Sequence, residues 1–425
     1  MEEQQAHRAA EAVFRIERAR LIAGLARIVR DVGLAEELAQ DALVAALEHW
    51  PRNGTPQNPG AWLMATAKRR AIDRLRHQRM AERKHLEIGR DMETQTFANG
   101  AIEALEAAMD DDIGDERLSL IFTACHPVLS TDARVALTLR LIGGLTTDEI
   151  AHAYLASETT IAQRIVRAKK ALRQSGVAYE VPRGGDRDAR LTSVLEVLYL
   201  IFNEGYAASA GEDLMRPQLC QEAMRLGRIL ERLAPTEAEV HGLVALMEIQ
   251  ASRLSARTAA DGSLLPITRQ NRGRWDHLLI RRGLAALERA EQLGGARGPY
   301  ALQAALAACH ARAATAEDTD WRRIASLYDV LQQVLPSPVV DLNRAIAHSM
   351  AFGPERGLEL LSDLEQEGAL DGYAPLPAAR GDFLFRAGRM DEAADAFSDA
   401  AALSRNAPER AFLQARARAC GADGN

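Results

Sequence analysis

Helical periodicity is the sequence feature that most limits what this chain can fold into. In almost every segment, apolar residues recur at the three- and four-residue spacing of an amphipathic helix. No run alternates β-branched and polar residues as a half-buried strand does. A chain of 425 residues is also too long for one compact core. The sequence therefore predicts an all-α protein of several domains.

Polar and proline-rich segments divide the chain into separate helical blocks. The parts are an N-terminal block, an acidic linker, a middle block and a C-terminal block, at residues 9–83, 84–114, 115–178 and 186–425. In the N-terminal block the expected helices span residues 9–32, 35–50 and 60–83. The intervening residues 51–59 contain three prolines and are expected to form a loop.

The C-terminal block is rich in alanine and leucine and is interrupted at short intervals. Breaks are expected near Gly211, Pro235, Gly262, Gly294, Pro336, Gly353, Gly372 and Gly388. This spacing predicts stacked helical hairpins, because one hairpin cannot bury its apolar face alone. Residues 378–397 look like a tetratricopeptide unit, whose small residues allow two helices to approach closely.

Two basic clusters stand out against a net charge of −7. Residues 68–84 contain eight lysines and arginines and two acids, and residues 164–173 contain five and no acid. Local clustering matters more than net charge, because charges are screened beyond about 8 Å at physiological salt. One such cluster is typical of a solvated helix face. Two clusters on either side of an acidic linker favour contact with nucleic-acid phosphates.

Other features bear on location. No apolar run approaches the roughly 20 residues that a membrane span needs, and the acidic start Met1-Glu2-Glu3-Gln4 does not resemble a secretory signal. The cysteines are far apart and contain no Cys-x-x-Cys pair; they are Cys125, Cys220, Cys309 and Cys420. This usage is typical of a reducing compartment. We expect a cytoplasmic protein with no membrane contact.

The sequence gives little support for catalysis or metal binding. The adjacent pairs Cys125-His126 and Cys309-His310 cannot supply a tetrahedral ligand set, and no helically spaced ligand pair accompanies them. No Walker loop, nucleotide fingerprint or hydrolase elbow is present. We expect no metal, no cofactor and no enzymatic activity.

The middle block carries a helix-turn-helix pattern. Gly143 and Gly144 are expected to end one helix, and Thr146 or Thr147 to cap the next. After a break at residues 156–158, a basic amphipathic helix is expected at 160–172.

The two faces of that basic helix differ. The predicted buried face consists of Ile161, Ile165, Ala168 and Leu172. The opposite face offers Ala162, Gln163, Val166, Arg167 and Lys170 to solvent or to a major groove about 12 Å wide. A generic solvated helix pair is the alternative interpretation.

Residues 147–151 and 158–169 resemble the −35-reading domain of sigma factors. The matching positions are Thr160, Ile161, Arg164, Ile165, Arg167, Ala168 and Lys169. Thr159 replaces the usual glycine, and Ala162 stands where many relatives have a basic residue. The resemblance implies −35 contacts by Thr160, Gln163, Arg164, Val166, Arg167, Lys169 and Lys170. Among these we assign a base or near-base contact to Arg167 and phosphate contacts to Lys169 and Lys170.

Residues 35–47 resemble the sigma-factor helix that grips the clamp coiled coil of RNA polymerase. From residue 31 to 50 there are five acids and no lysine or arginine, which suits a basic partner helix. Helical spacing turns Leu38, Ala42, Ala45 and Ala46 inward and Glu37, Gln40, Asp41 and Glu48 outward. The residues assigned to polymerase binding are Glu37, Leu38, Gln40 and Asp41. An ordinary acidic amphipathic helix is the alternative.

Residues 62–76 resemble the segment that melts the −10 element. Strand separation loses stacking and pairing, which capture of a flipped base can offset; in the family the preceding loop, here residues 52–58, supplies that pocket. The assigned −10 residues are Arg52, Asn53, Asn58, Trp62, Lys68, Arg69, Arg70, Arg74 and Arg76. The expected buried stripe is Trp62, Leu63, Ala67, Ile72 and Leu75, so Trp62 is either a core residue or a stacking platform.

The whole chain resembles extracytoplasmic-function (group IV, sigma-70 type) sigma factors of the subgroup with a tetratricopeptide-like C-terminal extension. Residues 122–127, 199–206 and 318–321 carry the resemblance to that extension subgroup. It implies a sigma domain two bundle, a sigma domain four helix-turn-helix and a helical-repeat extension. The implied partners are promoter DNA and the clamp coiled coil and flap of core RNA polymerase. The extension is expected to regulate activity through an intramolecular contact or a regulatory protein.

Two alternatives remain open at this stage. The chain could be a polymerase-independent helix-turn-helix regulator, normally a dimer, with a ligand- or protein-sensing repeat domain. Within the extension, Tyr199, Asn203, Glu204 and Tyr206, or Arg272, Trp275 and Asp276, could line a ligand pocket. Interhelical packing and capping are the other explanation for these residues.

Overall fold

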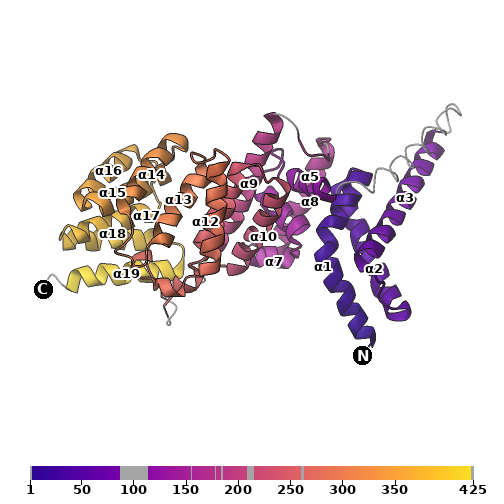
Figure 1. The fold of residues 1–425 in the computed structure, drawn as a ribbon, viewed down its shortest axis with the longest axis horizontal. Helices are drawn as coiled ribbons and strands as arrows, with labels where there is room; N and C mark the ends of the chain where they lie inside the picture. The colour runs from indigo at the N-terminus through magenta and orange to yellow at the C-terminus, as the bar shows by residue number, and fades with distance from the viewer. Residues whose placement is uncertain are drawn as a thin grey trace. The chain divides into compact units, whose positions relative to one another are not determined.

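The structure is a computed structural model that describes residues 2–86, 113–154, 156–177, 179–182, 185–207, 215–259 and 263–422 (Figure 1). Helices dominate these ranges, and β-pairing is limited to isolated bridges such as the one between Thr258 and Leu264. The predicted all-α class is confirmed. Within the same ranges, no helix combines the length and apolar character that crossing a membrane requires.

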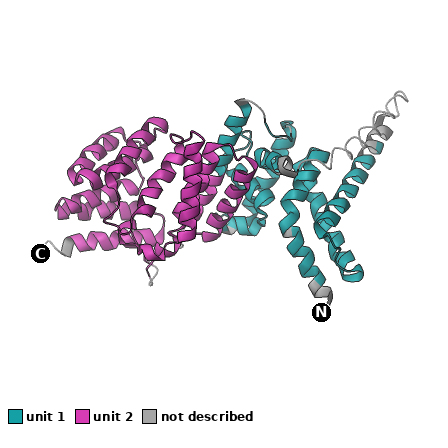
Figure 2. Ribbon diagram, in the orientation of Figure 1, with its two compact units in different colours: residues 1–197 teal, residues 198–425 magenta. Residues whose placement is uncertain are grey.

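The chain forms two compact units, residues 1–197 and residues 198–425 (Figure 2). We call them the first and second units. The boundary lies inside helix α9 (Gly185–Tyr206), which is continuous from one unit into the other. Most of the predicted acidic linker, residues 87–112, lies outside the described residues.

The first unit begins with three helices that pack as a bundle. They are α1 (Glu2–Val29), α2 (Val32–Asn53) and α3 (Pro59–Leu86), and each contacts the other two. Fully buried side chains from all three form the core, including Leu25, Trp50 and Leu63. Asp31 caps α2 by accepting hydrogen bonds from the backbone N–H groups of Gly33 (2.7 Å) and Leu34 (3.1 Å).

Helix α2 is longer than the sequence predicts, because it continues through Pro51. Proline has no N–H, so the Leu47 carbonyl four residues earlier loses its helical donor. Nε2 of His7, on α1, lies 3.1 Å from that oxygen and takes the place of the missing donor. The helix ends at Asn53, where Gly54 adopts a positive φ of 79°. The predicted loop at 51–59 therefore shrinks to residues 54–58.

A second group of helices completes the first unit. It consists of α5 (Ile113–Ala124), α6 (Thr131–Thr138), the π-helical turn η2 (Leu139–Gly143), α7 (Thr147–Ala153), α8 (Glu158–Gln174) and the start of α9. Helix α8 packs against α6 and α7, while α5 and η2 contact α1.

The N-terminal half of α9 forms hydrogen bonds to α5 and to Cys125, the residue that follows α5. The Ser193 hydroxyl donates to the Cys125 carbonyl at 2.6 Å, and Arg190 donates to the Phe122 carbonyl at 3.1 Å. Arg134 of α6 donates to Ser193 at 2.5 Å and forms an ion pair with Glu196 at 3.0 Å. The thiol of Cys125 is buried, which raises its pKa to about 12. These contacts fix residues 190–196 to the first unit.

The second unit is a succession of helical hairpins. Its helices are α10 (Pro217–Leu233), α11 (Ala238–Ala251), α12 (His277–Gln292), α13 (Pro299–Arg312), α14 (Trp321–Val334), α15 (Pro338–Phe352), α16 (Pro354–Glu367), α17 (Pro375–Arg386), α18 (Met390–Leu403) and α19 (Ala407–Ala422). Short 3-10 turns η3 (Leu254–Ala256), η4 (Ile267–Arg269) and η5 (Arg272–Arg274) precede α12. Each helix from α10 to α18 contacts the next one along the chain.

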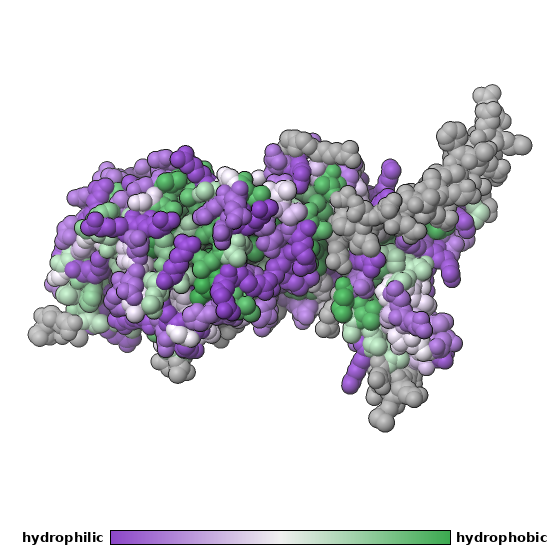
Figure 3. Space-filling model, viewed as in Figure 1, coloured by the Kyte–Doolittle hydropathy of each residue, from purple (hydrophilic) through white to green (hydrophobic). Residues whose placement is uncertain are grey.

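The predicted hairpin breaks mostly fall between these helices. Those that do are Pro235, Gly294, Pro336, Gly353, Gly372 and Gly388. Gly211 and Gly262 lie outside the described residues. A further break between α13 and α14 carries no proline or glycine, which is why the sequence did not reveal it. On the face drawn in Figure 3, hydrophilic side chains cover much of the described surface, with hydrophobic patches between them.

Close approach of α17 and α18 depends on Gly381. A Cβ atom at this position would lie 2.9 Å from the Phe397 ring, closer than side chains normally pack. We expect Gly381→Val to lower the free energy of unfolding by about 1–3 kcal/mol through overpacking, as measured by urea denaturation followed by circular dichroism. Ala402→Val, at an exposed position of α18, is the control and should change it by less than about 0.5 kcal/mol. Equal losses in both variants would show that the close approach is unimportant.

Candidate nucleic-acid interface

Helices α7 and α8 form the predicted helix-turn-helix. Gly144, with a φ of 79°, ends the preceding turn η2. A capping box starts α7: the Glu149 N–H donates to the Thr146 hydroxyl at 3.1 Å, and the Thr146 N–H donates to the Glu149 carboxylate at 2.7 Å. The Ser157 hydroxyl accepts from the Thr160 N–H at 3.1 Å and starts α8. Local capping chemistry thus determines both helix starts.

Helix α8 has the two faces that the sequence predicts. Its buried residues are Ile161, Ile165, Ala168 and Leu172. Its exposed residues include Ala162, Gln163, Val166, Arg167 and Lys170. Within the described residues, Gln163, Arg167 and Lys170 form no side-chain hydrogen bond or ion pair, and the apolar Val166 is 64% exposed. This face can therefore offer both hydrogen-bond donors and an apolar contact to base edges.

The other three residues assigned to the −35 element have partners inside the protein. Arg164 forms an ion pair with Asp132 of α6 at 3.0 Å. The Thr160 hydroxyl lies 2.8 Å from that of Ser157. Lys169 forms a short ion pair with Glu36 of α2. To bind a DNA phosphate, Lys169 would have to break its ion pair with the Glu36 carboxylate.

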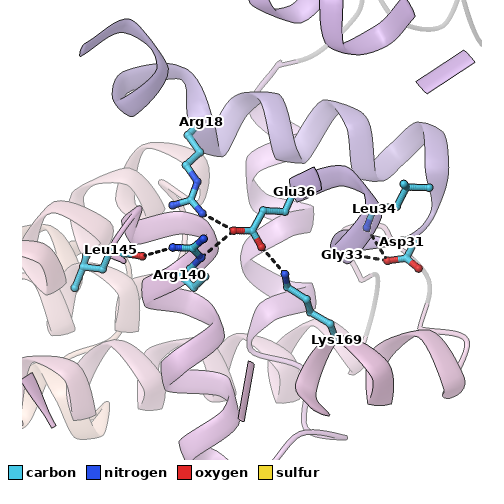
Figure 4. Close-up of polar contacts among 8 residues, drawn as sticks. All are labelled: Arg18, Asp31, Gly33, Leu34, Glu36, Arg140, Leu145 and Lys169. Carbon is cyan, nitrogen blue, oxygen red and sulfur yellow. Dashed lines mark hydrogen bonds and ion pairs between the residues drawn. The ribbon is translucent and has the colours of Figure 1, made fainter. Parts of the chain in front are cut away.

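Glu36 is the centre of a buried ionic cluster (Figure 4). Its carboxylate, 6% exposed, contacts Arg18 of α1 at 2.5 Å, Arg140 of η2 at 2.9 Å, and Lys169. Arg140 also donates to the Leu145 carbonyl at 3.2 Å. Burial alone would raise the pKa of Glu36, but the three cations outweigh burial and hold that pKa below its usual value. Glu36 therefore stays ionised and joins the three-helix bundle to the helix-turn-helix.

Sequence reasoning missed this cluster, although one signal was present. Glu36 lies among the apolar positions of α2 that are buried, between Ala35 and Leu38 and one turn after Val32. An acid at such a position is rarely buried without a cationic partner. Its cations come from positions 18, 140 and 169, and nothing in the sequence pairs positions so far apart.

A hollow between α2 and α8 brings two predicted surfaces together. Glu37, Gln40 and Asp41 line it from α2, and Ala162 and Val166 line it from α8. These are residues assigned to polymerase binding on one side and the exposed face of the basic helix on the other. Leu38, also assigned to polymerase binding, is 4% exposed and packs in the bundle core, as its inward spacing predicts. A second ion pair between the same two elements joins Asp31 and Arg173 at 3.4 Å.

The residues assigned to the −10 element lie on α3 and around residues 54–58. The exposed ones are Arg52, Asn53, Asn58, Arg69, Arg74 and Arg76, and the partly buried ones are Trp62, Lys68 and Arg70. Arg70 donates to the Asp41 carbonyl at 2.7 Å. Asn58 accepts from the Ala61 N–H at 3.1 Å and so caps α3. The side chains of Arg79, Arg83 and Lys84 lie outside the described residues.

Trp62 is partly buried against Trp50 and His49, with ring centroids 5.7 Å and 5.4 Å away. Leu63 and Ala67 are buried as predicted, but the third buried position is Ala71 and not Ile72. Positions 63, 67 and 71 follow a four-residue spacing, which places Ile72 at the margin of the buried stripe. Within the described residues there is no group of three or more histidine, cysteine or acidic side chains that could hold a metal ion.

Comparison with known proteins identifies the family. Residues 13–80 match Sigma-70 region 2, and residues 119–172 match Sigma-70, region 4. The chain is 30% identical over 156 residues to the ECF RNA polymerase sigma factor SigK of Mycobacterium ulcerans (strain Agy99), covering 35% of this chain and 75% of that protein. The chain belongs to the ECF RNA polymerase sigma factors. SigK of Mycobacterium bovis (strain BCG / Pasteur 1173P2) gives 31% identity over 155 residues, with 35% and 74% coverage.

The part of this sigma factor beyond region 4 also has relatives. Residues 190–291 match a family of unknown function, DUF6596. An uncharacterized protein of Rhizobium meliloti (strain 1021) is 39% identical over 398 residues, covering 93% of this sigma factor and 92% of that protein. The region 2 match covers most of α1 to α3, and the region 4 match covers the second half of α5, α6, and most of the helix-turn-helix. The DUF6596 match begins at Arg190, the residue of α9 that bonds to the Phe122 carbonyl.

Proposed function

We propose that this sigma factor binds core RNA polymerase, directs it to specific promoters and is modulated by its C-terminal helical extension. The exposed face of α8 carries the proposal. It presents Gln163, Arg167 and Lys170, which have no hydrogen-bond or ion-pair partner in the described part of the chain, above a buried stripe that packs α8 against its neighbours. A rigid basic helix with free donors is what major-groove readout requires.

In this proposal the three-helix bundle contacts both polymerase and the −10 element. Glu37, Gln40 and Asp41 on α2 would face the basic clamp coiled coil, and the second helical group would contact the flap. The exposed arginines of α3 would follow the DNA backbone while residues 52–58 capture a flipped base. The acidic linker, residues 84–114, would occupy a basic path in polymerase by imitating nucleic-acid charge.

Binding to polymerase and DNA would also require the first unit to open. Glu37, Gln40 and Asp41 of α2 and Ala162 and Val166 of α8 line one hollow, so polymerase and DNA could not both occupy it with the two helices this close. The ion pairs of Glu36 with Lys169 and of Asp31 with Arg173 hold the two elements together. We propose that polymerase and promoter phosphates replace these intramolecular partners.

The polymerase-binding part of the proposal is tested by retention on immobilised bacterial core polymerase at low salt. We expect Glu37→Arg combined with Asp41→Arg to reduce retention about tenfold or more, because like charges at an interface cost several kcal/mol. Glu11→Arg, at an exposed position of α1, is the matched control and should be retained normally. If the unaltered protein fails to associate with core polymerase but binds duplex DNA, the protein is a polymerase-independent regulator and the proposal is wrong.

The role of the extension is tested by truncation, and the position of the cut matters. A chain ending before α9 loses the contacts of Arg190, Ser193 and Glu196 with the first unit. A chain ending at Ala207 keeps them. Activity is measured by run-off transcription with core enzyme and genomic fragments. If the chain that ends at Ala207 is more active than the full-length protein, the extension is inhibitory. If that chain loses activity, the extension is a required scaffold. Unchanged activity would contradict modulation by the extension.

A further inference from the structure

A cavity of about 410 Å³ lies within the second unit. Helices α9, α11, α13, α14 and α15 surround it. Helix α9 lines it with Tyr199, Phe202, Asn203 and Tyr206, which follow the spacing of one continuous helix face. Helices α11 and α13 line it with the same spacing. The volume falls in the range of about 300–1,000 Å³ that small-molecule sites occupy.

The cavity wall combines apolar and aromatic side chains with a small set of polar groups. The polar groups include four side-chain amides, those of Asn203, Gln250, Gln303 and Asn343. Arg253 is the one formally charged residue among the described residues that line the cavity, and none of these is an aspartate or glutamate. Tyr328, from α14, is buried enough that its pKa rises to about 12, so its hydroxyl stays protonated. The wall therefore offers hydrogen-bond donors and one cation, but no anion.

Arg253 has neutral partners only. Its guanidinium donates to the Gln250 side-chain oxygen at 2.6 Å and to the Tyr206 hydroxyl, and it lies 5.6 Å from the Tyr206 ring and 5.7 Å from the Trp275 ring. No carboxylate of the described chain lies within ion-pair distance of it. A partly buried cation of this kind gains from an anion that can replace lost solvation.

Two more arginines add positive charge beside Arg253. Arg257 lies over the Tyr206 ring at 4.0 Å, and Arg272 lies over the Trp275 ring at 4.8 Å. Burial lowers the pKa of both, and the charge of Arg253 lowers it further. Glu317 and Asp318 oppose this effect at Arg272 only in part.

His310 lies close enough to Arg253 and Arg272 for their charge to act on its ring. It lines the cavity, and burial together with Arg253 and Arg272 lowers its pKa to about 3, so the ring is neutral at pH 7. Its Nδ1 atom is buried and has no hydrogen-bond partner in the described structure. Burial is the largest cause of this pKa shift, and the positive charge of Arg253 and Arg272 adds to it in the direction that favours a negatively charged guest.

We propose that this cavity binds a small organic anion, a carboxylate or phosphate group carried on an apolar or aromatic body. Arg253 would hold the anionic group, and the aromatic side chains of α9 and α14 would hold the body. The site goes beyond the proposed sigma-factor function, because occupancy requires neither polymerase nor DNA. Binding of such a ligand would allow a small molecule to regulate the extension.

The experiment measures binding of paired probes to the full-length protein by saturation-transfer NMR. The anionic probes are indole-3-acetate and phenyl phosphate, and the neutral ones are indole-3-acetamide and benzyl alcohol. We expect the anionic probes to bind about ten- to a hundredfold tighter than their neutral counterparts, the effect of one charge-assisted hydrogen bond in a partly buried site. Comparing the two anions decides between a carboxylate and a phosphate ligand. Equal affinity for anionic and neutral probes, or no binding by either class, would overturn the proposal.

Variants assign the effect to the cavity. Arg253→Met should abolish the preference for anions, and Arg253→Lys should keep most of it. Arg289→Met, at an exposed position of α12 outside the cavity, is the matched control and should leave the preference unchanged. Thermal unfolding followed by circular dichroism shows whether each variant is folded. If Arg253→Met is misfolded, the proposal is tested by the anion preference of Arg253→Lys compared with that of Arg289→Met. An anion preference that survives in folded Arg253→Met would place the site elsewhere.

Discussion

Glu36→Gln is expected to lower the free energy of unfolding of the first unit by about 3–5 kcal/mol at pH 7, the usual result of breaking a buried ion pair. The substitution keeps the shape of the side chain but removes the negative charge that faces Arg18, Arg140 and Lys169. Arg18 suffers most, because its side chain is 6% exposed and cannot turn to solvent. Burial already lowers the pKa of Arg18, and the Glu36 carboxylate is what opposes that effect.

The same substitution has a characteristic pH dependence. The pKa of Glu36 in the folded protein lies below its usual value near 4.5, which the unfolded chain keeps. A carboxyl group shifted in this direction stabilises the fold fully above its unfolded pKa and loses its contribution as the pH falls through its folded pKa. The difference in stability between the original protein and Glu36→Gln should therefore be constant near neutral pH and shrink below about pH 4.5.

Urea unfolding monitored by circular dichroism at several pH values measures both effects. Glu48→Gln, at an exposed position on the same helix, is the control and should shift stability by less than about 0.5 kcal/mol. A Glu36→Gln protein as stable as the original at pH 7 would show that the cluster contributes nothing. A deficit that persists undiminished at acidic pH would mean that packing, and not charge, is responsible.

The sequence predicted the helix-turn-helix accurately because local chemistry determines it. Thr146 and Ser157 lie next to the N–H groups that they cap, and the buried residues of α8 follow a single helical period. The same reasoning placed most hairpin breaks of the second unit at glycines and prolines. Local reasoning failed where a structure depends on a residue far away in the sequence. The helix was predicted to end before Pro51, but His7 replaces the missing hydrogen-bond donor and the helix continues.

The candidate site was predictable in composition but not in its connections. The exposed residues of α8 and the acidic residues of α2 follow from periodicity. That these two surfaces line one hollow, and that Lys169 is held by Glu36, depends on contacts across more than a hundred residues. The cavity of the second unit was predictable only in part, because the sequence indicated some of its lining residues but not how they come together. The sequence offered Tyr199, Asn203, Glu204 and Tyr206 as possible lining residues, and all but Glu204, which pairs with Arg216, lie in the cavity wall. The other set that it offered, Arg272, Trp275 and Asp276, is not part of the wall, and Asp276 caps α12 instead.

Arg167→Ala is expected to weaken specific promoter binding by about 1–3 kcal/mol, the loss of one base contact, and to relax the sequence preference at the position that it reads. Arg167 is exposed on α8 and has no hydrogen-bond or ion-pair partner among the described residues, so its substitution removes no such interaction there. Lys170, on the same face, is assigned to a phosphate. Lys170→Ala should therefore weaken binding to all sequences alike and reduce the salt dependence of binding by about one unit of slope.

Binding of the polymerase holoenzyme to cognate and scrambled promoter fragments, measured by fluorescence anisotropy at several salt concentrations, separates the two roles. Gln174→Ala, at the exposed end of α8, is the control and should match the original protein. An Arg167→Ala protein that keeps its preference for the cognate fragment would remove this residue from the base-reading set. If Arg167→Ala instead weakened cognate and scrambled binding equally, Arg167 would be a phosphate contact. The exposed face of α8 would then bind DNA without reading its sequence at that position.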